Sequence, residues 1–416
     1  MQAMRMKRVL ITNQHGENRG DESALRAMLD GLSSRFDNIS FTVIAQLQDT
    51  SLEISFKEDV RLLHMKMSIL SFLGLVIYAF FQNVGLSIPW LLLADTKKIV
   101  DAYKECDIVV SAPGGPYFGD IYSNHEILHW FYVWLGSIYG KPLFLYAPSA
   151  GPFEIRWLNY IRKHFYKKFD VLSLREDISR GYLEGLIGTG REIHVTADSA
   201  LQQSVEPMAR DEYFVGSKSV DKTKFLVAVS AIEYKFPGAK EPQARHQEYT
   251  QILLKCLHHL ASRENCHFLF IPQLYGKVHT DVPYLKSLSS KLPHNATWEI
   301  VDQAFDSNAQ RSIFGMCDLC IASRYHPQIF SGSSGVPGIC IYYEHKALGF
   351  MRAMGLEDYA FDIRKLDIAV VTKKLNEAID KRKTLSEAMK KRILPIRNRS
   401  RQTTDLLIEL MDGQRP

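Results

Sequence analysis

The chain begins its first regular segment with Arg8-Val-Leu-Ile-Thr12 and continues with Asn13-Gln-His-Gly16-Glu-Asn18-Arg-Gly20-Asp21-Glu22. The apolar run predicts a buried strand. The residues that follow place apolar side chains at a 3.6-residue period, which predicts a helix from about residue 21: Ala24, Leu25, Met28, Leu29 and Leu32. The glycines between the two elements predict a turn in which backbone N–H groups approach a ligand closely. Strand, glycine-rich turn and helix in this order are typical of a parallel α/β sheet.

The same alternation of strands and helices continues along the chain. Further strands are expected at residues 41–45, 107–111, 142–147 and 171–174. A polar, interrupted segment at 205–224 resembles an interdomain linker. After it, strands are expected at 225–230, 267–272, 319–322 and 338–342, with a helix at 248–263. We therefore predict an α/β protein with two Rossmann-like domains facing a cleft. They would span residues 1–205 and 206–416, with C-terminal helices packing back on the first domain.

The composition excludes several classes of protein. The 416 residues are 46% hydrophobic and 23% charged, as in a folded globular protein rather than a disordered one. A net charge of +5 does not by itself indicate nucleic-acid binding, and it is compatible with an anionic small substrate or membrane surface. The first residues show no signal-peptide pattern, which predicts a cytoplasmic protein. Cys317 and Cys320 form a C-x-x-C without a second ligand pair, so we expect free thiols and no zinc site.

One segment, from Ser68 to Phe81, is apolar all round, and Ile88 to Leu93 is nearly so. Both are shorter than the roughly 20 residues that span a bilayer. Two interpretations stay open: a helix buried in a large domain, or an apolar surface that touches a membrane or a partner. The stretch 156–168 mixes basic and aromatic side chains as interfacial helices do, although a solvated helix face would look similar.

Glycine-rich and charged loops follow several of the expected strands. One of these loops predicts either the lining of a ligand-binding site or an ordinary tight turn. Its sequence is Ser111-Ala-Pro-Gly114-Gly115-Pro-Tyr-Phe-Gly119-Asp120. Arg175 directly follows the strand expected at residues 171–174. An arginine there can hold a carboxylate or phosphate, or can pair with Glu176, Asp177 or Asp198. Asp21 is expected to cap the first helix.

The most informative cluster surrounds two consecutive strands of the second half. Ser323-Arg324-Tyr325-His326-Pro327 follows one strand, and Tyr342-Tyr343-Glu344-His345-Lys346 ends the next. Parallel strands would bring Arg324, His326 and Lys346 to one edge of the sheet. Two cations and an imidazole suit an anion that carries phosphate and carboxylate and undergoes proton transfer.

Taken together, these motifs resemble the polysaccharide pyruvyl transferase family. The matching pieces appear in the family's order between Lys7 and Gly355: Asn18-Arg-Gly20-Asp21-Glu22, Gly114-Gly115 with Asp120, Ser173-Leu-Arg175-Glu-Asp177-Ile-Ser179, Ala197-Asp198-Ser-Ala, Ser323-Arg324-Tyr-His326, and Gly335-Val-Pro337 through Lys346. Departures include Arg19, Pro113, and Pro327 directly after the histidine.

The resemblance implies a glycosyltransferase-B-like fold and transfer of pyruvate from phosphoenolpyruvate to a sugar as a ketal, in polysaccharide biosynthesis. It implies a donor pocket that uses Arg175, His326 and Lys346, and Arg324 joins them by its position next to His326. We therefore expect His326, Arg324 and Lys346 to carry the reaction, and Arg175, Arg324 and Lys346 to bind phosphoenolpyruvate, mainly on the C-terminal domain. The acceptor would lie on the N-terminal domain, near Asn18, Gly20, Asp21, Glu22, Gly114, Gly115 and Asp120. Phosphoenolpyruvate would be a co-substrate, with no cofactor, metal or nucleic acid, and a lipid-linked acceptor would place the enzyme at the inner face of the membrane.

Two other functions fit the same pattern less well. A nucleotide-sugar glycosyltransferase of the same architecture would need a carboxylate for the ribose, for which Glu344 could serve. A non-catalytic member of a polysaccharide assembly complex would have no need of the Arg-x-His pair and Lys346.

Overall fold

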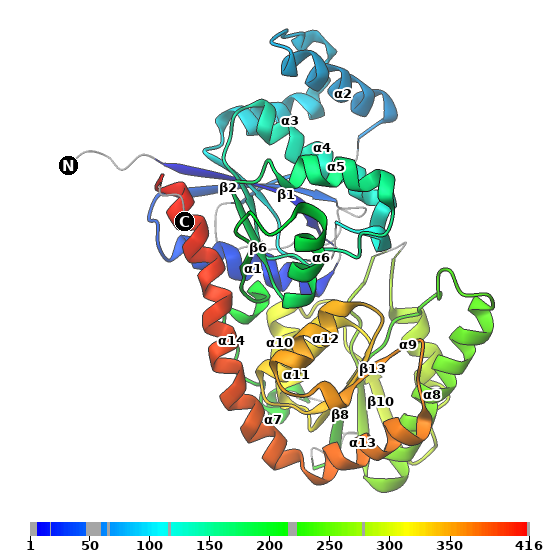
Figure 1. Ribbon diagram of the computed structural model, residues 1–416. Helices are drawn as coiled ribbons and strands as arrows, with labels where there is room; N and C mark the ends of the chain where they lie inside the picture. Colours follow the sequence, from blue (N-terminus) through cyan, green and yellow to red (C-terminus); the bar gives the residue numbers. More distant parts are fainter. Residues whose placement is uncertain are drawn as a thin grey trace. The chain divides into compact units, whose positions relative to one another are not determined.

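The computed structural model describes residues 6–16, 18–46, 60–64, 67–114, 118–214, 223–276 and 279–413. The chain forms two compact units, each built on its own parallel sheet (Figure 1). The first unit comprises residues 1–17, 21–202 and 397–416, and the second comprises residues 18–20 and 203–396. The predicted class of two parallel α/β domains is therefore confirmed. The chain passes between the units after Gln202, whereas the sequence had suggested a boundary at residue 205.

The first unit contains a seven-stranded sheet of order β3-β2-β1-β4-β5-β6-β7. Its strands are β1 (Lys7–His15), β2 (Ile39–Gln46), β3 (Val60–His64), β4 (Ile108–Ser111), β5 (Leu143–Leu145), β6 (Val171–Leu174) and β7 (His194–Val195). All its strand pairs are parallel. The sequence did not predict β3 or β7, because β7 is two half-buried residues and β3 is a short mixed run at the sheet's edge.

Helices cover both faces of this sheet because side chains alternate along each strand. Val9 and Ile11 of β1 pack on one side with α1, and Leu10 packs on the other with α3 and α4. The helices are α1 (Arg19–Ser33), α2 (Ile69–Asn83), α3 (Ala94–Glu105), α4 (Ser123–Ile138), α5 (Arg156–Tyr166) and α6 (Asp177–Ile187), with 3-10 turns η1 (Pro89–Leu91), η2 (Asp120–Tyr122) and η3 (Ser199–Leu201).

The second unit contains a six-stranded parallel sheet of order β10-β9-β8-β11-β12-β13. The strands are β8 (Phe225–Ser230), β9 (Cys266–Phe270), β10 (Thr297–Ile300), β11 (Leu319–Ala322), β12 (Gly338–Tyr342) and β13 (Ala360–Asp362). Its helices are α7 (Arg210–Tyr213), α8 (Pro242–Arg263), α9 (Val282–Ser289), α10 (Ser307–Met316), α11 (Tyr325–Ser333), α12 (His345–Ala353) and α13 (Ile368–Asp380), with η4 (Glu357–Tyr359). The strand order reverses between β8 and β11, and ligands of such sheets bind beyond the carboxyl ends of the strands at this point.

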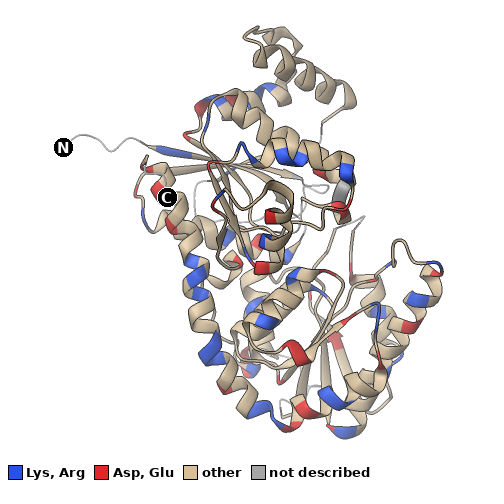
Figure 2. Ribbon diagram, in the orientation of Figure 1, with Lys and Arg blue, Asp and Glu red and all other residues tan. Residues whose placement is uncertain are grey.

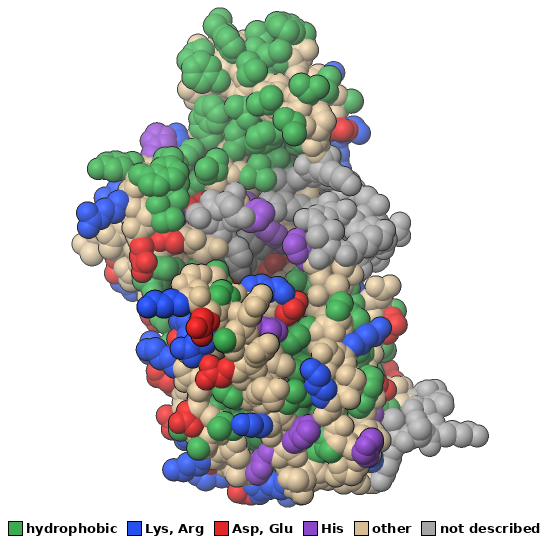
Figure 3. Space-filling model, turned by 90° about the vertical axis from the view of Figure 1, so that its right-hand side faces the viewer, with side chains coloured by type: hydrophobic (Ala, Val, Ile, Leu, Met, Phe, Trp, Pro, Cys, Tyr) green, Lys and Arg blue, Asp and Glu red, His purple; other side chains and the backbone are tan. Residues whose placement is uncertain are grey.

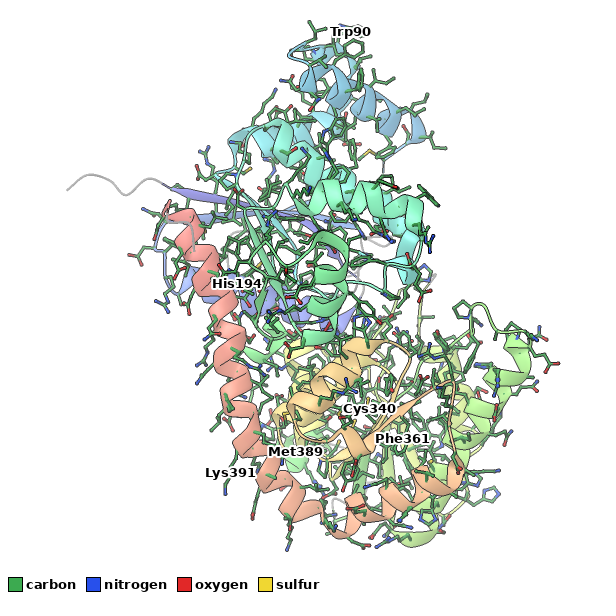
Figure 4. The ribbon with its side chains drawn as sticks, viewed as in Figure 1. Trp90, His194, Cys340, Phe361, Met389 and Lys391 are labelled. Carbon is green, nitrogen blue, oxygen red and sulfur yellow. The ribbon has the colours of Figure 1, made fainter. Side chains whose placement is uncertain are left out.

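The last helix, α14 (Arg382–Met411), begins in the second unit and ends in the first. In its first half Met389 is buried, while Lys391 is exposed and points away from the protein (Figure 4). In its last turns Leu407 and Leu410 join the core of the first unit, beside β1, β2 and α1.

The structure distinguishes between the two interpretations of the apolar segment at 68–81. It forms α2, and Leu75, Tyr78 and Ala79 are buried, but Ile69 and Leu70 are 80% and 77% exposed. The interpretation as a buried helix therefore holds for one face of α2 only, and the opposite face is exposed. Among the described residues, no helix is both long and apolar enough to cross a membrane.

Candidate functional site

The predicted cluster of the second unit lies where β8, β11 and β12 end. Ser230, Ala322 and Cys340 are paired across these three strands, so their carboxyl ends meet at one edge. Beyond the edge, the Ser323 amide donates to the Ser230 carbonyl over 2.9 Å, and the Ser323 hydroxyl lies 2.8 Å from that of Tyr249. These contacts fix the backbone from which Arg324 and His326 project.

Arg324 is held by a buried carboxylate. Its guanidinium forms an ion pair with Asp281, whose side chain is only 3% exposed. The second oxygen of Asp281 accepts the backbone N–H groups of Gln273 and Leu274 at 3.0 and 3.1 Å. Burial raises the pKa of the neighbouring Tyr343, and a hydrogen bond from Arg324 opposes that rise. The guanidinium is thus fixed in position, with one carboxylate beside it.

His326 occupies the first turn of α11, and Gly20 lies directly against its ring. A Cβ atom on Gly20 would be 1.8 Å from His326 Nδ1, so a larger residue could not occupy this position without moving the imidazole. The ring centroid is 4.9 Å from that of Tyr325. Pro327 follows in the same first helical turn, where a missing N–H costs no intrahelical hydrogen bond. The departure from the family pattern at Pro327 is therefore compatible with the helix.

Lys346 lies in the first turn of α12, which follows β12. Its Nζ is 2.5 Å from Glu344 Oε2, and the two side chains are 10% and 2% exposed. The same ammonium lies 5.7 Å from the centroid of the Tyr325 ring, which is itself packed against His326. Tyr325 thus connects Lys346 and His326. The sequence identified both cations but missed Asp281, which is 43 residues from Arg324, and Glu344 as the partner of Lys346.

Arg175 belongs to the first unit, directly after β6. Its Nη1 lies 2.7 Å from Asp198 Oδ2, its Nε donates to the Ser149 hydroxyl over 2.7 Å, and its side chain is 1% exposed. The ion pair with Asp198 was one of the alternatives open from the sequence, and the structure shows it. A role for Arg175 in binding phosphoenolpyruvate stays a prediction.

The first predicted loop is divided between the units. Residues 18–20 belong to the second unit, which corrects the assignment of Asn18 and Gly20 to the N-terminal domain. The Arg19 amide donates to the Gln273 carbonyl over 3.1 Å, and its guanidinium lies 5.5 Å from the centroid of the Tyr275 ring. Asn18 precedes α1 and its side chain accepts the Gly20 N–H at 2.8 Å, so Asn18 caps the helix in place of the predicted Asp21.

The other predicted acceptor residues have structural partners or a special backbone. Asp21 and Glu22 are buried in the first turn of α1, and Glu22 lies 2.9 Å from Arg26. Gly114 has a φ of 146°, a conformation that favours glycine. Asp120 lies 2.7 Å from Arg162, a side chain that is fully buried. Gly115 lies outside the described residues. Binding of the acceptor by these residues stays a prediction.

Sequence reasoning missed two neighbouring histidines, His15 at the end of β1 and His129 in α4. The rings of His15 and His129 lie 5.7 Å apart, and burial, with the nearby His129 and His125, lowers the pKa of His15 to about 3. His15 is therefore neutral at pH 7. Asn13, two residues earlier, has a φ of 64° and donates to the Ser111 hydroxyl across the reversal point between β1 and β4. The only sequence signal was a histidine directly after an apolar strand.

All six cysteines are free and buried. Burial raises the pKa of Cys320 to about 12, so this thiol of the C-x-x-C is protonated and a poor metal ligand. In the part of the chain that the structure describes, no three His, Cys, Asp or Glu side chains are grouped so that they could hold a metal ion.

The comparisons with known proteins agree with the motif order. The sequence model of the polysaccharide pyruvyl transferase family matches residues 18–345, which include both strands of the cluster. The chain belongs to the polysaccharide pyruvyl transferase family. One curated relative is the amylovoran biosynthesis protein AmsJ of Erwinia amylovora. This pyruvyl transferase family member is 24% identical to it over 395 residues, which cover 90% of this chain and 92% of that protein.

Solved structures show the fold of this pyruvyl transferase family member. Anabaena HepE in complex with UDP-glucose matches with a TM-score of 0.61 at 12% identity, covering 98% and 99% of the two chains. The putative UDP-N-acetylglucosamine 2-epimerase from Listeria monocytogenes matches with a TM-score of 0.60 at 14% identity, covering 99% and 98%. The predicted glycosyltransferase-B-like fold is thereby confirmed, and at these identities the likeness concerns the fold alone.

Proposed function

We propose that this protein transfers the pyruvyl group of phosphoenolpyruvate to a sugar of a polysaccharide or of its precursor, forming a cyclic ketal. One observation carries the proposal: Arg324, His326 and Lys346 follow neighbouring strands of one sheet in a chain that belongs to the pyruvyl transferase family. The AmsJ relative, a protein of amylovoran biosynthesis, supports an exopolysaccharide as the product.

The reaction requires one proton to be delivered and two to be removed. Protonation of the donor's methylene carbon makes C2 electrophilic, and a sugar hydroxyl attacks it. The C2–O bond to phosphate then breaks, and a second hydroxyl closes the ketal. Of the two hydroxyl protons, one balances the proton placed on carbon and the other leaves with inorganic phosphate. An imidazole can carry out these transfers near neutral pH. In the proposal, His326 is the group that does so.

The two cations would bind the donor's phosphate and carboxylate. Arg324 and Lys346 each have a buried carboxylate neighbour, Asp281 and Glu344, so the pairs carry little net charge before the donor binds. These carboxylates hold the cations in place without reorganisation during the reaction. A fixed arginine also presents several N–H donors in one plane, which suits a carboxylate or phosphate.

The decisive experiment incubates the purified protein with labelled phosphoenolpyruvate and candidate acceptors, and measures phosphate release and product mass. His326→Asn should lower kcat by about 100-fold or more, because general acid–base groups contribute that much, while phosphoenolpyruvate still binds. His294→Asn, at an exposed histidine of the same unit, is the matched control and should act as wild type. Unchanged turnover of His326→Asn would exclude the proposed proton transfer and would favour a non-catalytic assembly role.

The glycosyltransferase alternative makes a different binding prediction. In a thermal-shift assay, phosphoenolpyruvate should raise the Tm, whereas a panel of UDP-sugars should not. The reverse result would favour a nucleotide-sugar enzyme in which Glu344 contacts the ribose. That role competes with the contact between Glu344 and Lys346.

Turnover should not depend on a metal ion. In the proposal, the N–H groups of Arg324 and Lys346 make the contacts to phosphate oxygens that a metal ion makes in other enzymes. Incubation with excess EDTA followed by desalting should leave the rate of phosphate release unchanged. Activity lost in EDTA and restored by magnesium would show this prediction to be wrong.

A further inference from the structure

We propose that the first unit binds to the surface of an anionic phospholipid membrane through an exposed apolar face on α2 and η1 and a basic, aromatic face on α5. This inference is independent of the donor chemistry. It concerns where the protein works and does not depend on which group it transfers.

The first part of this surface is a continuous apolar segment. Residues 67–94 contain no charged side chain, and the ribbon of α2 is free of charge colours in Figure 2. The apolar face consists of side chains that are between 36% and 80% exposed: Ile69, Leu70, Leu73, Ile77, Phe80, Phe81, Val84, Leu86, Trp90 and Leu93. Trp90 is 79% exposed and lies at the outer end of the unit (Figure 4). Apolar faces of this extent mark contact with a membrane or a partner.

The second part is the outer face of α5. Trp157, Tyr160 and Ile161 are 63%, 80% and 37% exposed, and the basic residues Arg156, Lys163 and Lys167 are exposed beside them. Tryptophan and tyrosine side chains with adjacent cations are typical of helices that lie in the headgroup region of a bilayer.

One cation of α5, Arg162, does not contribute to the exposed face. It points inward, is fully buried, and lies 2.7 Å from both Asp120 and Glu126. Exposed acids near α5 are Glu154 before it, Asp170 after it, and Asp177 on α6, which packs against α5. The Asp170 carboxylate accepts a hydrogen bond from the Leu143 amide. Helix α5 itself contains no acidic residue, so the charges that its own outer face carries are positive.

The two parts are joined by α4 and face the same way. Helix α4 packs against both α2 and α5. In Figure 3 the hydrophobic side chains over the outer end of the first unit and a second hydrophobic group with basic side chains beside it face the viewer together. A cationic margin next to an apolar surface selects anionic lipid over a neutral apolar partner. No described helix can span a bilayer, so the contact would be interfacial.

Vesicle co-sedimentation tests the proposal with the full-length protein. Wild type should bind vesicles of phosphatidylcholine with phosphatidylglycerol at low salt, and should bind pure phosphatidylcholine vesicles much less. The double variant Leu70→Ser, Trp90→Ser removes apolar contact and should lower binding about tenfold or more. Lys163→Gln with Lys167→Gln should lower binding to the anionic vesicles by about 30-fold and abolish most of its salt dependence.

Matched controls exist in the second unit. Trp298→Ser replaces a tryptophan that is 42% exposed, and Lys391→Gln replaces an exposed lysine. Both should bind vesicles as wild type does. Absence of wild-type binding to anionic vesicles, or binding that neither double variant weakens, would overturn the proposal. A dimer in solution that Leu70→Ser, Trp90→Ser dissociates, without vesicle binding, would instead assign the face to a second copy of the chain and would also overturn it.

Discussion

His326 and Gly20 are 306 positions apart in the sequence, yet the imidazole lies against the glycine Cα. The space that a Cβ would need is occupied by His326 Nδ1. Gly20 is the second residue of α1, and glycine forms helices less readily than alanine, by up to about 1 kcal/mol within a helix. The glycine is therefore unfavourable for local structure, and the position of the imidazole explains why it is there.

Gly20→Ala should lower activity while leaving the fold intact. The new methyl group would displace the His326 ring, and a misplaced acid–base group costs about 100-fold in rate. Circular dichroism should be unchanged, and the imidazole NMR signals of His326 should shift. Gly185→Ala, within helix α6, is the control, since the Cβ that it adds would enter open space with no neighbouring atom within 4 Å. Wild-type activity of Gly20→Ala would show that the ring can move without consequence.

At the scale of elements, the last turns of α14 complete the first unit. Leu407 is fully buried in the core beside β1, β2 and α1. The Thr404 hydroxyl lies 2.6 Å from that of Tyr146, and the Ser400 hydroxyl donates to the Asp198 carbonyl over 2.6 Å. Asp198 is the partner of Arg175, so the C-terminal helix supports the loop that holds this arginine.

Leu407→Ala should lower the free energy of unfolding of the first unit by about 2 to 5 kcal/mol, because a buried leucine leaves a cavity. Leu394→Ala, in the same helix but 55% exposed, should cost well under half of that. Urea unfolding followed by circular dichroism measures both. Equal effects of the two variants would mean that the end of α14 does not contribute to the core.

At the scale of the whole molecule, each unit encloses an imidazole that folding keeps neutral. Burial lowers the pKa of His15 in the first unit to about 3 and that of His267 in the second unit to about 4. The unfolded chain takes up these protons below about pH 6.5, whereas the folded chain does so only near pH 3 to 4. Both groups therefore favour the unfolded state increasingly as the pH falls from 6.5 toward 4.

The Tm should fall as the pH is lowered through this window, with each histidine contributing at most about 1.4 kcal/mol per pH unit. His267→Asn should flatten the curve of Tm against pH between 6.5 and 4, whatever its effect on the Tm at pH 7. Replacement of the exposed His294 by Asn should leave the slope unchanged. A slope that His267→Asn does not alter would mean that its imidazole is protonated in the folded state.

The amino-acid sequence by itself determined the central strands of both sheets, the two-domain α/β class and the order of the motifs. These follow from periodicity, turn residues and the strand ends at which Arg324, His326 and Lys346 stand. The tertiary structure alone decided that Arg324 pairs with Asp281, that Arg175 pairs with Asp198, and that residues 18–20 belong with the second unit. It also decided that one side of α2 is exposed. Such contacts join positions far apart in the chain, and no local pattern records which distant surface a side chain will meet.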